Sequence, residues 1–243
     1  MDTALLEEHL ARLGLRLEPA QRERFCRYYR ELLAWSRRIN LTTIVAWEEV
    51  QVQHFFDSLT CLPFLPPQAW GEPYRMVDIG SGAGFPGLPL KIFLPQAGLT
   101  LIESVAKKTA FLRHLVEVLE LDAVQVLTCR AEEAGRDPAH REAYDLALAR
   151  AVAGLPTLVE YALPLLRLGG LFVAYKGREV EEEVAQAQEA LRLLGGRLGA
   201  VRPVEWPGLE APRHLVFIEK VSPTPERFPR RPGLPAKRPL RGN

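Results

Sequence analysis

Apolar residues recur at three- and four-residue spacing through roughly the first 70 positions of the chain. Residues 4–13 carry leucines on one helical face and stop at Gly14, and residues 19–39 begin with Pro19, which suits a first helical turn. A third periodic segment covers residues 46–62, and four prolines between residues 63 and 73 end it. This pattern predicts a helical N-terminal region over residues 1–72.

Beyond residue 73, short apolar runs alternate with helical segments. The strand-like runs occupy residues 74–80, 99–104, 123–129, 144–151, 170–177 and 214–221. The helical patterns occupy residues 87–95, 107–120, 155–167 and 179–195. Strands that alternate with helices form mainly parallel sheets with helices on both faces. We therefore expect an α/β, Rossmann-like sheet over residues 73–221, with the helical region as an N-terminal extension.

The last segment, residues 222–243, differs from the rest of the chain in pattern and in charge. It contains six prolines and no apolar period, which predicts an extended or disordered tail. Its six basic residues and one acid give the tail a charge of +5, so the remaining chain carries −4 of the net +1. A basic, proline-rich tail on a mildly acidic body favours a polyanionic partner.

Composition and cysteine usage exclude several classes of protein. The 243 residues are 47% hydrophobic and 25% charged, as in ordinary soluble domains. No stretch approaches the ~20 apolar residues that span a membrane, and the acidic N-terminus lacks the features of a secretory signal. Cys26, Cys61 and Cys129 are too far apart for a disulfide framework or a zinc motif. We expect a cytoplasmic protein with no metal and no membrane partner.

The sequence RMVDIGSGAGFPGLPLKIF has the form of a strand, a glycine-rich loop and a helix. Such loops bring backbone N–H groups and a helix N-terminus close to a ligand. Gly82, Gly84 and Gly87 satisfy the dinucleotide pattern G-x-G-x-x-G. In a second frame, Asp78 followed by alternate glycines from Gly80 fits the loop that binds S-adenosylmethionine, a cofactor without phosphate. Both frames remain open at this point.

Polar residues follow the next strand-like runs at the edge where such folds bind ligands. Glu103 lies about 20 residues beyond the loop, where an acid can hold two ribose hydroxyls. Both types of cofactor use this contact, so Glu103 indicates a nucleoside without choosing between them. Ala131 and Glu132 follow the third run and could face an adenine edge, and Arg150 ends the fourth run.

The order of these motifs resembles one protein family over nearly the whole chain. INLTTI, HFFDSL, VDIGSGAGFPGLPLKI, CRAEE, ARAVA, YKG and RHLVFIEK precede the tail RFPRRPGLPAKRPL. Together they resemble the bacterial small-subunit ribosomal RNA guanine-N7 methyltransferases, the glucose-inhibited division protein B family. GFPGLPLKI and the RRPG and PAK elements of the tail are the most specific parts, since the glycines alone also fit other methyltransferases.

The resemblance implies a class I methyltransferase fold, S-adenosylmethionine as cofactor, and 16S ribosomal RNA or the small ribosomal subunit as partner. The candidate cofactor-binding residues are Asp78, Gly80, Gly82, Phe85, Glu103, Ser104, Val105, Ala131, Glu132 and Arg150. The candidate RNA-binding residues are Arg130, Lys176, Arg213, Arg230, Arg231, Lys237 and Arg238.

The resemblance further implies methyl transfer to N7 of one guanine of 16S ribosomal RNA, customarily numbered 527. N7 has an in-plane lone pair and no proton to remove, so direct in-line displacement needs no general base. This fits the absence of an obvious Cys, His or Ser nucleophile constellation in the sequence, and no residue is assigned as catalytic. Arg150 and Lys176 are candidates for positioning the substrate.

Other interpretations share parts of this pattern. They are another S-adenosylmethionine-dependent RNA or small-molecule methyltransferase, a nicotinamide-dependent oxidoreductase and a non-enzymatic RNA binder. Asn40, His54 and Asp57 fit local capping or pairing as well as a wall of a guanine pocket, whereas Phe55 and Phe56 fit the core. We expect a monomer, and we expect deletion of the tail to leave cofactor affinity nearly unchanged.

Overall fold

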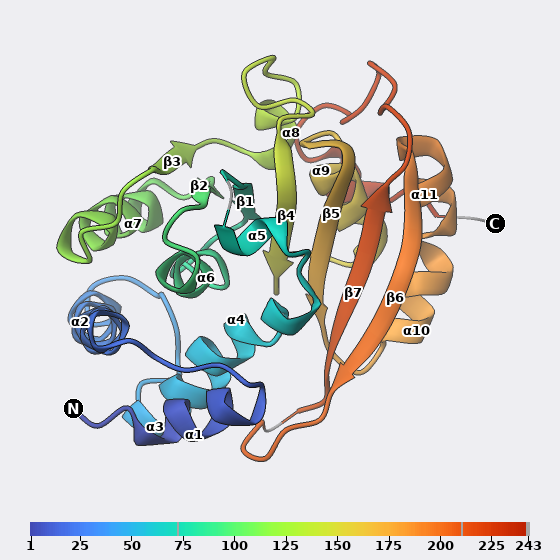
Figure 1. Ribbon diagram of the computed structural model, residues 1–243. Coiled ribbons are helices and arrows are strands. Elements are labelled where there is room, and N and C mark those ends of the chain that lie inside the picture. Colours follow the sequence, from blue (N-terminus) through green and yellow to red (C-terminus); the bar gives the residue numbers. More distant parts are fainter. Residues whose placement is uncertain (72, 210, 242–243) are drawn as a thin grey trace.

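The computed structural model describes residues 1–71, 73–209 and 211–241, which are arranged around a seven-stranded sheet (Figure 1). The strands are β1 (Arg75–Ile79), β2 (Gly98–Glu103), β3 (Val124–Thr128), β4 (Tyr144–Arg150), β5 (Leu166–Lys176), β6 (Gly196–Val204) and β7 (Arg213–Lys220). Their order is β3-β2-β1-β4-β5-β7-β6. The pairings among β1 to β5 are parallel, and β7 is antiparallel to both neighbours. The expected mainly parallel α/β sheet is confirmed.

Helices cover both faces of this sheet (Figure 1). One face carries α1 (Ala4–Arg12), α2 (Pro19–Ser36), α3 (Trp47–Glu49), η1 (Val50–Phe56), α4 (Asp57–Leu59), η2 (Leu62–Phe64), α5 (Gln68–Gly71), α6 (Gly87–Phe93) and α7 (Ala106–Val118). The other carries α8 (Ala131–Ala134), α9 (Leu155–Ala162), α10 (Val180–Gln186), α11 (Gln188–Leu194) and α12 (Leu234–Lys237).

Alternate residues of the central strands supply the two cores. In β4, Leu146 and Leu148 pack with the N-terminal helices, whereas Ala147 and Ala149 pack with α9 and α11. Burial on both faces explains why these strands read as continuous apolar runs instead of alternating ones. The N-terminal helices therefore share one hydrophobic core with the sheet, and Phe55 and Phe56 are fully buried within it, as expected.

Two elements differ from the sequence-based prediction. β6 was not expected, because GRLGAVRPV contains two glycines and a proline and lacks a regular alternation. It is an edge strand that pairs only with β7 and carries a register shift between Leu198 and Ala200. Residues 46–62 were expected to form one helix, but their middle, Val50–Phe56, is a π-helix. Such wide turns are rare and are frequent at functional sites.

The tail folds back against the face covered by α9, which corrects the expectation of an extended or disordered segment. Phe228 is buried in the second core. Arg141 donates hydrogen bonds to the carbonyl oxygens of Thr224 and Phe228 at 2.7 and 2.8 Å, and Arg136 donates to Pro229 O at 2.8 Å. The tail cannot build a core of its own, but the domain supplies both an apolar socket and donors for its carbonyl groups.

Candidate functional site

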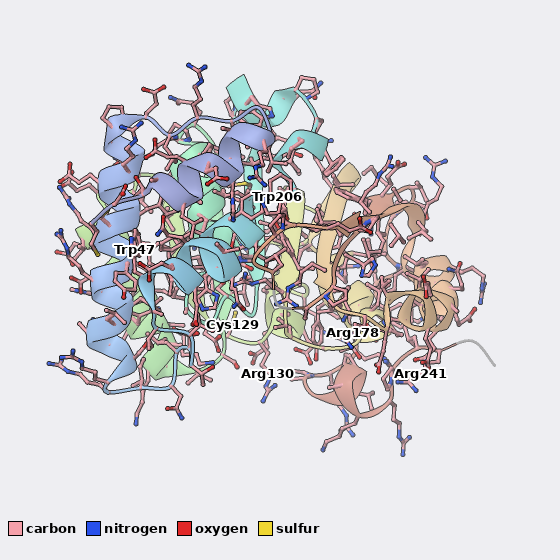
Figure 2. All side chains as sticks on the ribbon, turned by 90° about the horizontal axis from the view of Figure 1, so that it is seen from below. Trp47, Cys129, Arg130, Arg178, Trp206 and Arg241 are labelled. Atoms are coloured by element: carbon pink, nitrogen blue, oxygen red, sulfur yellow. The ribbon has the colours of Figure 1, made fainter. Side chains whose placement is uncertain are left out.

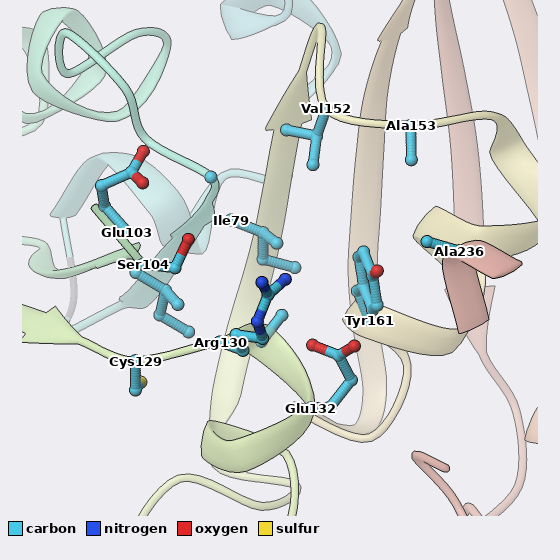
Figure 3. Close-up of a pocket in the computed structure, with 13 residues that line it drawn as sticks. Ile79, Glu103, Ser104, Cys129, Arg130, Glu132, Val152, Ala153, Tyr161 and Ala236 are labelled. Atoms are coloured by element: carbon cyan, nitrogen blue, oxygen red, sulfur yellow. The ribbon is translucent and has the colours of Figure 1, made fainter. Parts of the chain in front are cut away.

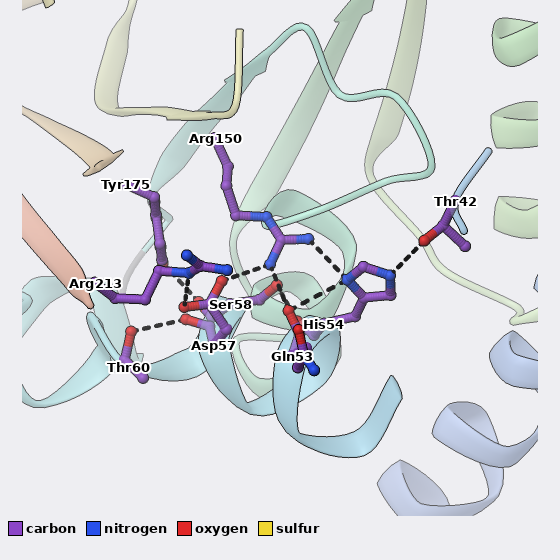
Figure 4. A network of polar contacts seen from close by, with 9 residues as sticks. All are labelled: Thr42, Gln53, His54, Asp57, Ser58, Thr60, Arg150, Tyr175 and Arg213. Carbon is purple, nitrogen blue, oxygen red and sulfur yellow. Dashed lines mark hydrogen bonds and ion pairs between the residues drawn. The ribbon is translucent and has the colours of Figure 1, made fainter. Parts of the chain in front are cut away.

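Two pockets open at the edge where the parallel strands end. The first is lined by Ile79, Gly80, Ile102, Glu103, Ser104, Cys129, Arg130, Ala131, Glu132, Val152, Ala153, Tyr161 and Ala236 (Figure 3). The second is lined by Ile44, Gln53, His54, Asp57, Arg150, Ala151, Tyr175, Lys176, Gly177 and Arg213. Figure 4 shows the polar contacts that join six of these residues to their neighbours.

The segment that follows β4 forms the wall between the two pockets. Arg150 and Ala151 line the second pocket, and the next two residues, Val152 and Ala153, line the first. Ala151 has φ +57°, a left-handed conformation that is unfavourable for a residue with a side chain. Backbone strain of this kind concentrates at binding and active sites. Lys176 supports the same segment by donating to Ala153 O at 2.9 Å.

The glycines of the loop after β1 are required by their conformation and surroundings. Gly80, Gly82 and Gly84 have φ values of +68°, +57° and +95°. A Cβ on Gly80 would lie 2.7 Å from a methyl carbon of Val152, and one on Gly84 would lie 2.5 Å from the Tyr28 hydroxyl oxygen. A Cβ on Gly82 would instead meet only Gly80 O, at 3.8 Å. The space next to Gly82 is therefore open to a ligand.

Glu103 joins this loop to the turn after β2. The residue is 7% exposed, and its carboxylate accepts hydrogen bonds from Gly82 N at 3.1 Å and Val105 N at 2.9 Å. Each carboxylate oxygen has a second lone pair, so both can accept from further donors. Glu103 and the neighbouring Ser104 line the first pocket, and the carboxylate of Glu103 has the acceptors that a pair of ribose hydroxyls would need.

Asp78 lies beneath the loop and is fully buried. Its Oδ2 accepts a hydrogen bond from Gly87 N at 3.1 Å, which fixes the start of α6. Burial raises the pKa of Asp78 to about 7, and the Gly87 N–H partly opposes this shift. Its Oδ1 has no hydrogen-bond partner in the described part of the chain. The geometry gives Asp78 a role in holding the loop, with its carboxyl group out of contact with solvent.

The far wall of the first pocket combines α8, α9 and the tail (Figure 3). Glu132 is 2% exposed, and its Oε1 accepts a hydrogen bond from Gly233 N at 2.8 Å. Burial raises the pKa of Tyr161 to about 12, and the carboxylate of Glu132 adds to this effect. Sequence reasoning found Ala131 and Glu132 but missed Tyr161 and Ala236. Tyr161 reads as part of an apolar helix, and Ala236 lies in a segment expected to be disordered.

An ion pair forms the centre of the second pocket (Figure 4). The Asp57 side chain is 2% exposed, and its Oδ2 lies 2.7 Å from Nη1 of Arg150. Arg150 also donates to Gln53 O at 3.2 Å, and Arg213 Nε lies 3.7 Å from Asp57 Oδ1. Two guanidinium groups from the sheet therefore flank one carboxylate from the N-terminal helices. The sequence left two roles open for Asp57, local capping or pairing and a place in a pocket wall. The structure places its side chain in the wall of the second pocket.

His54 is a neutral member of this pocket. Burial and the neighbouring Arg150 lower the pKa of His54 to about 3. Its Nε2 lies 2.8 Å from Thr42 Oγ1, and its ring stacks on Phe85 with centroids 4.6 Å apart. Phe85 is held on its other side by Tyr28, at 5.2 Å. The predicted cofactor position Phe85 is therefore a buried support that joins the glycine loop to the second pocket.

Basic side chains gather around the two pockets. Arg130, Arg231, Lys237 and Arg238 are exposed, whereas Lys176 forms an ion pair with Glu183 at 2.6 Å. Figure 2 shows Arg130, Arg178 and Arg241 along the same side of the molecule. Next to the first pocket, another hollow is lined by Arg38, Ile39, Asn40, Val105, Lys107 and Lys108. Val105, another predicted cofactor position, lies there beside Asn40.

Two classes of site are absent from the residues that the structure describes. Across them, no group of three or more His, Cys, Asp and Glu side chains is arranged to hold a metal ion. In the same residues, none of the helices combines the length and apolar character needed to cross a membrane.

The sheet order and the glycine loop define the class of α/β methyltransferases, and solved structures share this fold. A putative O-methyltransferase from Klebsiella pneumoniae aligns with a TM-score of 0.54 and 18% identity, covering 89% of this chain and 96% of that one. A methyltransferase from Aquifex aeolicus, described as SAM dependent, aligns with a TM-score of 0.54 and 16% identity, covering 71% and 93%.

The family is shown by closer sequence matches. The family model described as "GidB: rRNA small subunit methyltransferase G" matches residues 21–214. Proteins named ribosomal RNA small subunit methyltransferase G are 56% identical in Roseiflexus castenholzii (93% of this chain, 95% of that protein) and 40% identical in Alkaliphilus metalliredigens (98% of each). The chain belongs to this family. It is an S-adenosylmethionine-dependent ribosomal RNA methyltransferase. Of the two patterns that the glycine loop satisfies, the family therefore selects the S-adenosylmethionine loop over the dinucleotide loop.

Proposed function

We propose that the chain transfers a methyl group from S-adenosylmethionine to N7 of guanine 527 of 16S ribosomal RNA, with the cofactor in the first pocket and the guanine in the second. The observation that carries this proposal is the shared wall at residues 150–153. Two pockets that meet at one strand end can bring a donor and an acceptor into line. Holding reactants in attack geometry is itself a large source of rate acceleration.

The residues of the first pocket fit the nucleoside part of the cofactor. Glu103 has free lone pairs for two ribose hydroxyls. Gly82, which donates its backbone N–H to Glu103, leaves open space where the ligand can approach the loop. Ile79, Ile102 and Tyr161 provide apolar surface for the purine. When bound, S-adenosylmethionine supplies the electrophilic methyl group.

The second pocket suits a reaction that removes no proton. The low pKa of His54 makes it a poor base near neutral pH, and the Asp57 carboxylate is paired with Arg150. Guanine N7 has a lone pair and no proton, so no base is required there. The guanine becomes positively charged as it is methylated, and Asp57 is a carboxylate placed where it can favour that charge. Arg150 and Arg213 can donate hydrogen bonds to O6 or to phosphate oxygens.

The test is methylation of unmodified 16S ribosomal RNA and of small subunits with labelled S-adenosylmethionine. Borohydride and aniline cleave RNA at 7-methylguanosine, and primer extension then locates the modified base. The proposal expects one cleavage site, at guanine 527. Label found on an exocyclic amine, at another guanine or on free nucleosides would instead favour a different RNA or small-molecule methyltransferase.

A further inference from the structure

The C-terminal tail contributes directly to the first pocket. Ala236 is one of the residues that line it, facing Tyr161 in Figure 3. Three residues earlier, Gly233 N donates a 2.8 Å hydrogen bond to Oε1 of Glu132, another lining residue. Tail residues therefore form part of the pocket and also orient one of its carboxylates.

A buried ion pair fixes the tail in this position. Glu160 of α9 is fully buried and lies next to Tyr161 in the chain. Arg230 donates to it from Nε at 2.9 and 3.0 Å, from Nη2 at 2.6 Å, and from its backbone N at 2.8 Å. A carboxylate left in this place without its partner would be costly, so undocking of the tail is strongly opposed. While docked, the Arg230 guanidinium is committed to Glu160.

Neighbouring contacts extend the docked segment along α9. Thr157 Oγ1 donates to Pro235 O at 3.3 Å, and Pro235 is buried. Pro229, Pro232 and Pro235 restrict the unfolded tail, so ordering this segment costs less conformational entropy. The segment can therefore adopt one conformation although it contains little regular structure.

We propose that residues 230–237 are a structural wall of the cofactor pocket, and that Gly233 positions Glu132 to bind the adenosine portion of S-adenosylmethionine. The inference rests on the proposed placement of the cofactor in the first pocket. It assigns the tail's inner side to cofactor binding, while Arg231, Lys237 and Arg238 point outward and remain exposed. It replaces the expectation that the tail can be deleted without effect on cofactor affinity.

The first experiment compares two truncated chains by calorimetry with S-adenosylmethionine and with adenosine. A chain that ends after Arg231 keeps Phe228 in the core and the Arg230–Glu160 ion pair but loses Gly233 and Ala236, and its affinity for both ligands should fall at least about tenfold. A chain that ends after Lys237 keeps these contacts and should bind both ligands within about twofold of the full chain. Equal affinities in all three chains would overturn the inference.

A second comparison avoids any loss of chain. Ala236→Trp places a bulky side chain at the pocket wall on an exposed residue, so it should lower cofactor affinity without unfolding the protein. Glu226→Trp is the matched control, because Glu226 is an exposed tail residue that does not line the first pocket. Cofactor should also slow hydrogen exchange of the Gly233 amide in the full chain. An Ala236→Trp chain that binds as tightly as its control would count against the tail as a pocket wall.

The proposed placement of the cofactor is tested separately with Glu103→Ala in the full chain. If Glu103→Ala loses affinity while the chain that ends after Arg231 does not, the cofactor still lies in the first pocket and only the role of the tail is overturned. Unchanged affinity in Glu103→Ala would remove the cofactor from the first pocket, whatever the truncations do.

Discussion

At the scale of single residues, the two pockets depend on groups held in unusual states. Gly82 adopts φ +57° beside open space, Ala151 is strained between the pockets, and His54 is kept neutral by its surroundings. None of these states can be read from the residue type alone. Each has a consequence that a single substitution can measure.

Gly82→Val should abolish cofactor binding while the protein stays folded. The positive φ costs a residue with a side chain about 1–2 kcal/mol, and the new methyl groups would occupy the open space next to position 82, where a ligand would approach the loop. Gly14→Val is the matched control, since Gly14 has φ +73° with nothing within 4 Å of its Cβ position. Circular dichroism and calorimetry should show similar stability losses in both variants, but a loss of cofactor affinity only at position 82. Retained affinity in Gly82→Val would contradict the loop assignment.

His54 should make the protein less stable in mild acid. Its pKa in the folded state is about 3, below the 6.5 of the unfolded chain, so the unfolded state binds more protons between these values. The resulting stability is present above pH 6.5 and is lost as pH falls towards 3. Between pH 7 and pH 5 the wild type should lose about 2 kcal/mol more free energy of unfolding than His54→Gln. Urea titrations at both pH values measure this double difference, and a value near zero would place His54 in a solvated site.

At the scale of elements, side chains tie the π-helix and α4 to the end of β4. The Asp57–Arg150 pair joins the two elements, and Tyr175 of β5 donates to Ser58 O at 2.6 Å. These contacts hold the N-terminal helices against the edge of the sheet. The second pocket therefore exists only when both parts of the chain are in place.

Asp57→Ala should lower the free energy of unfolding by about 3 kcal/mol, because it leaves the largely buried Arg150 without its counter-charge. Glu8→Ala is the control, since it breaks an exposed ion pair to Arg12 and should cost no more than about 0.5 kcal/mol. Urea unfolding of the three proteins gives both values. If Asp57→Ala lowers the free energy of unfolding as little as Glu8→Ala does, the charge of Arg150 is already stabilised by solvent.

The pattern of apolar residues predicted most elements, because buried strands and amphipathic helices leave clear signals. β6 was missed because an edge strand with one neighbour needs no regular apolar pattern. The tail was misjudged because its order comes from Glu160 and Arg141, which are far away in sequence. Glu103 and Glu132 could be found from their positions at or just after the ends of strands, whereas Tyr161 reads as part of an apolar helix and Ala236 lines the pocket only because the tail docks.

At the scale of the whole molecule, basic side chains lie near the first pocket on two sides. Arg231, Lys237 and Arg238 of the docked tail lie on one side. Arg38 and the lysines at 107 and 108 line the hollow beside Val105 on the other. An RNA strand that contacts both groups would pass the first pocket. Because the body of the chain is otherwise acidic, this arrangement selects where a polyanion can approach.

Neutralising the outward-facing tail residues should separate RNA binding from cofactor binding. The triple variant Arg231→Gln, Lys237→Gln, Arg238→Gln removes exposed charges but leaves the Arg230–Glu160 and Gly233–Glu132 hydrogen bonds intact. Its affinity for S-adenosylmethionine should match the wild type. Its affinity for 16S ribosomal RNA should fall, and the slope of log K against log salt should become shallower by roughly 0.7 to 0.9 for each phosphate that is no longer neutralised.

The matched control for this variant removes the same charge elsewhere. Arg12, Arg192 and Arg197 are exposed and lie outside both pockets, so replacing all three with Gln keeps the net charge equal to that of the tail variant. If the RNA follows the tail, only the tail variant should make the salt slope shallower by that amount. Equal slopes in the two variants would mean that net charge alone governs RNA affinity, and the outer side of the tail would then have no specific part in binding.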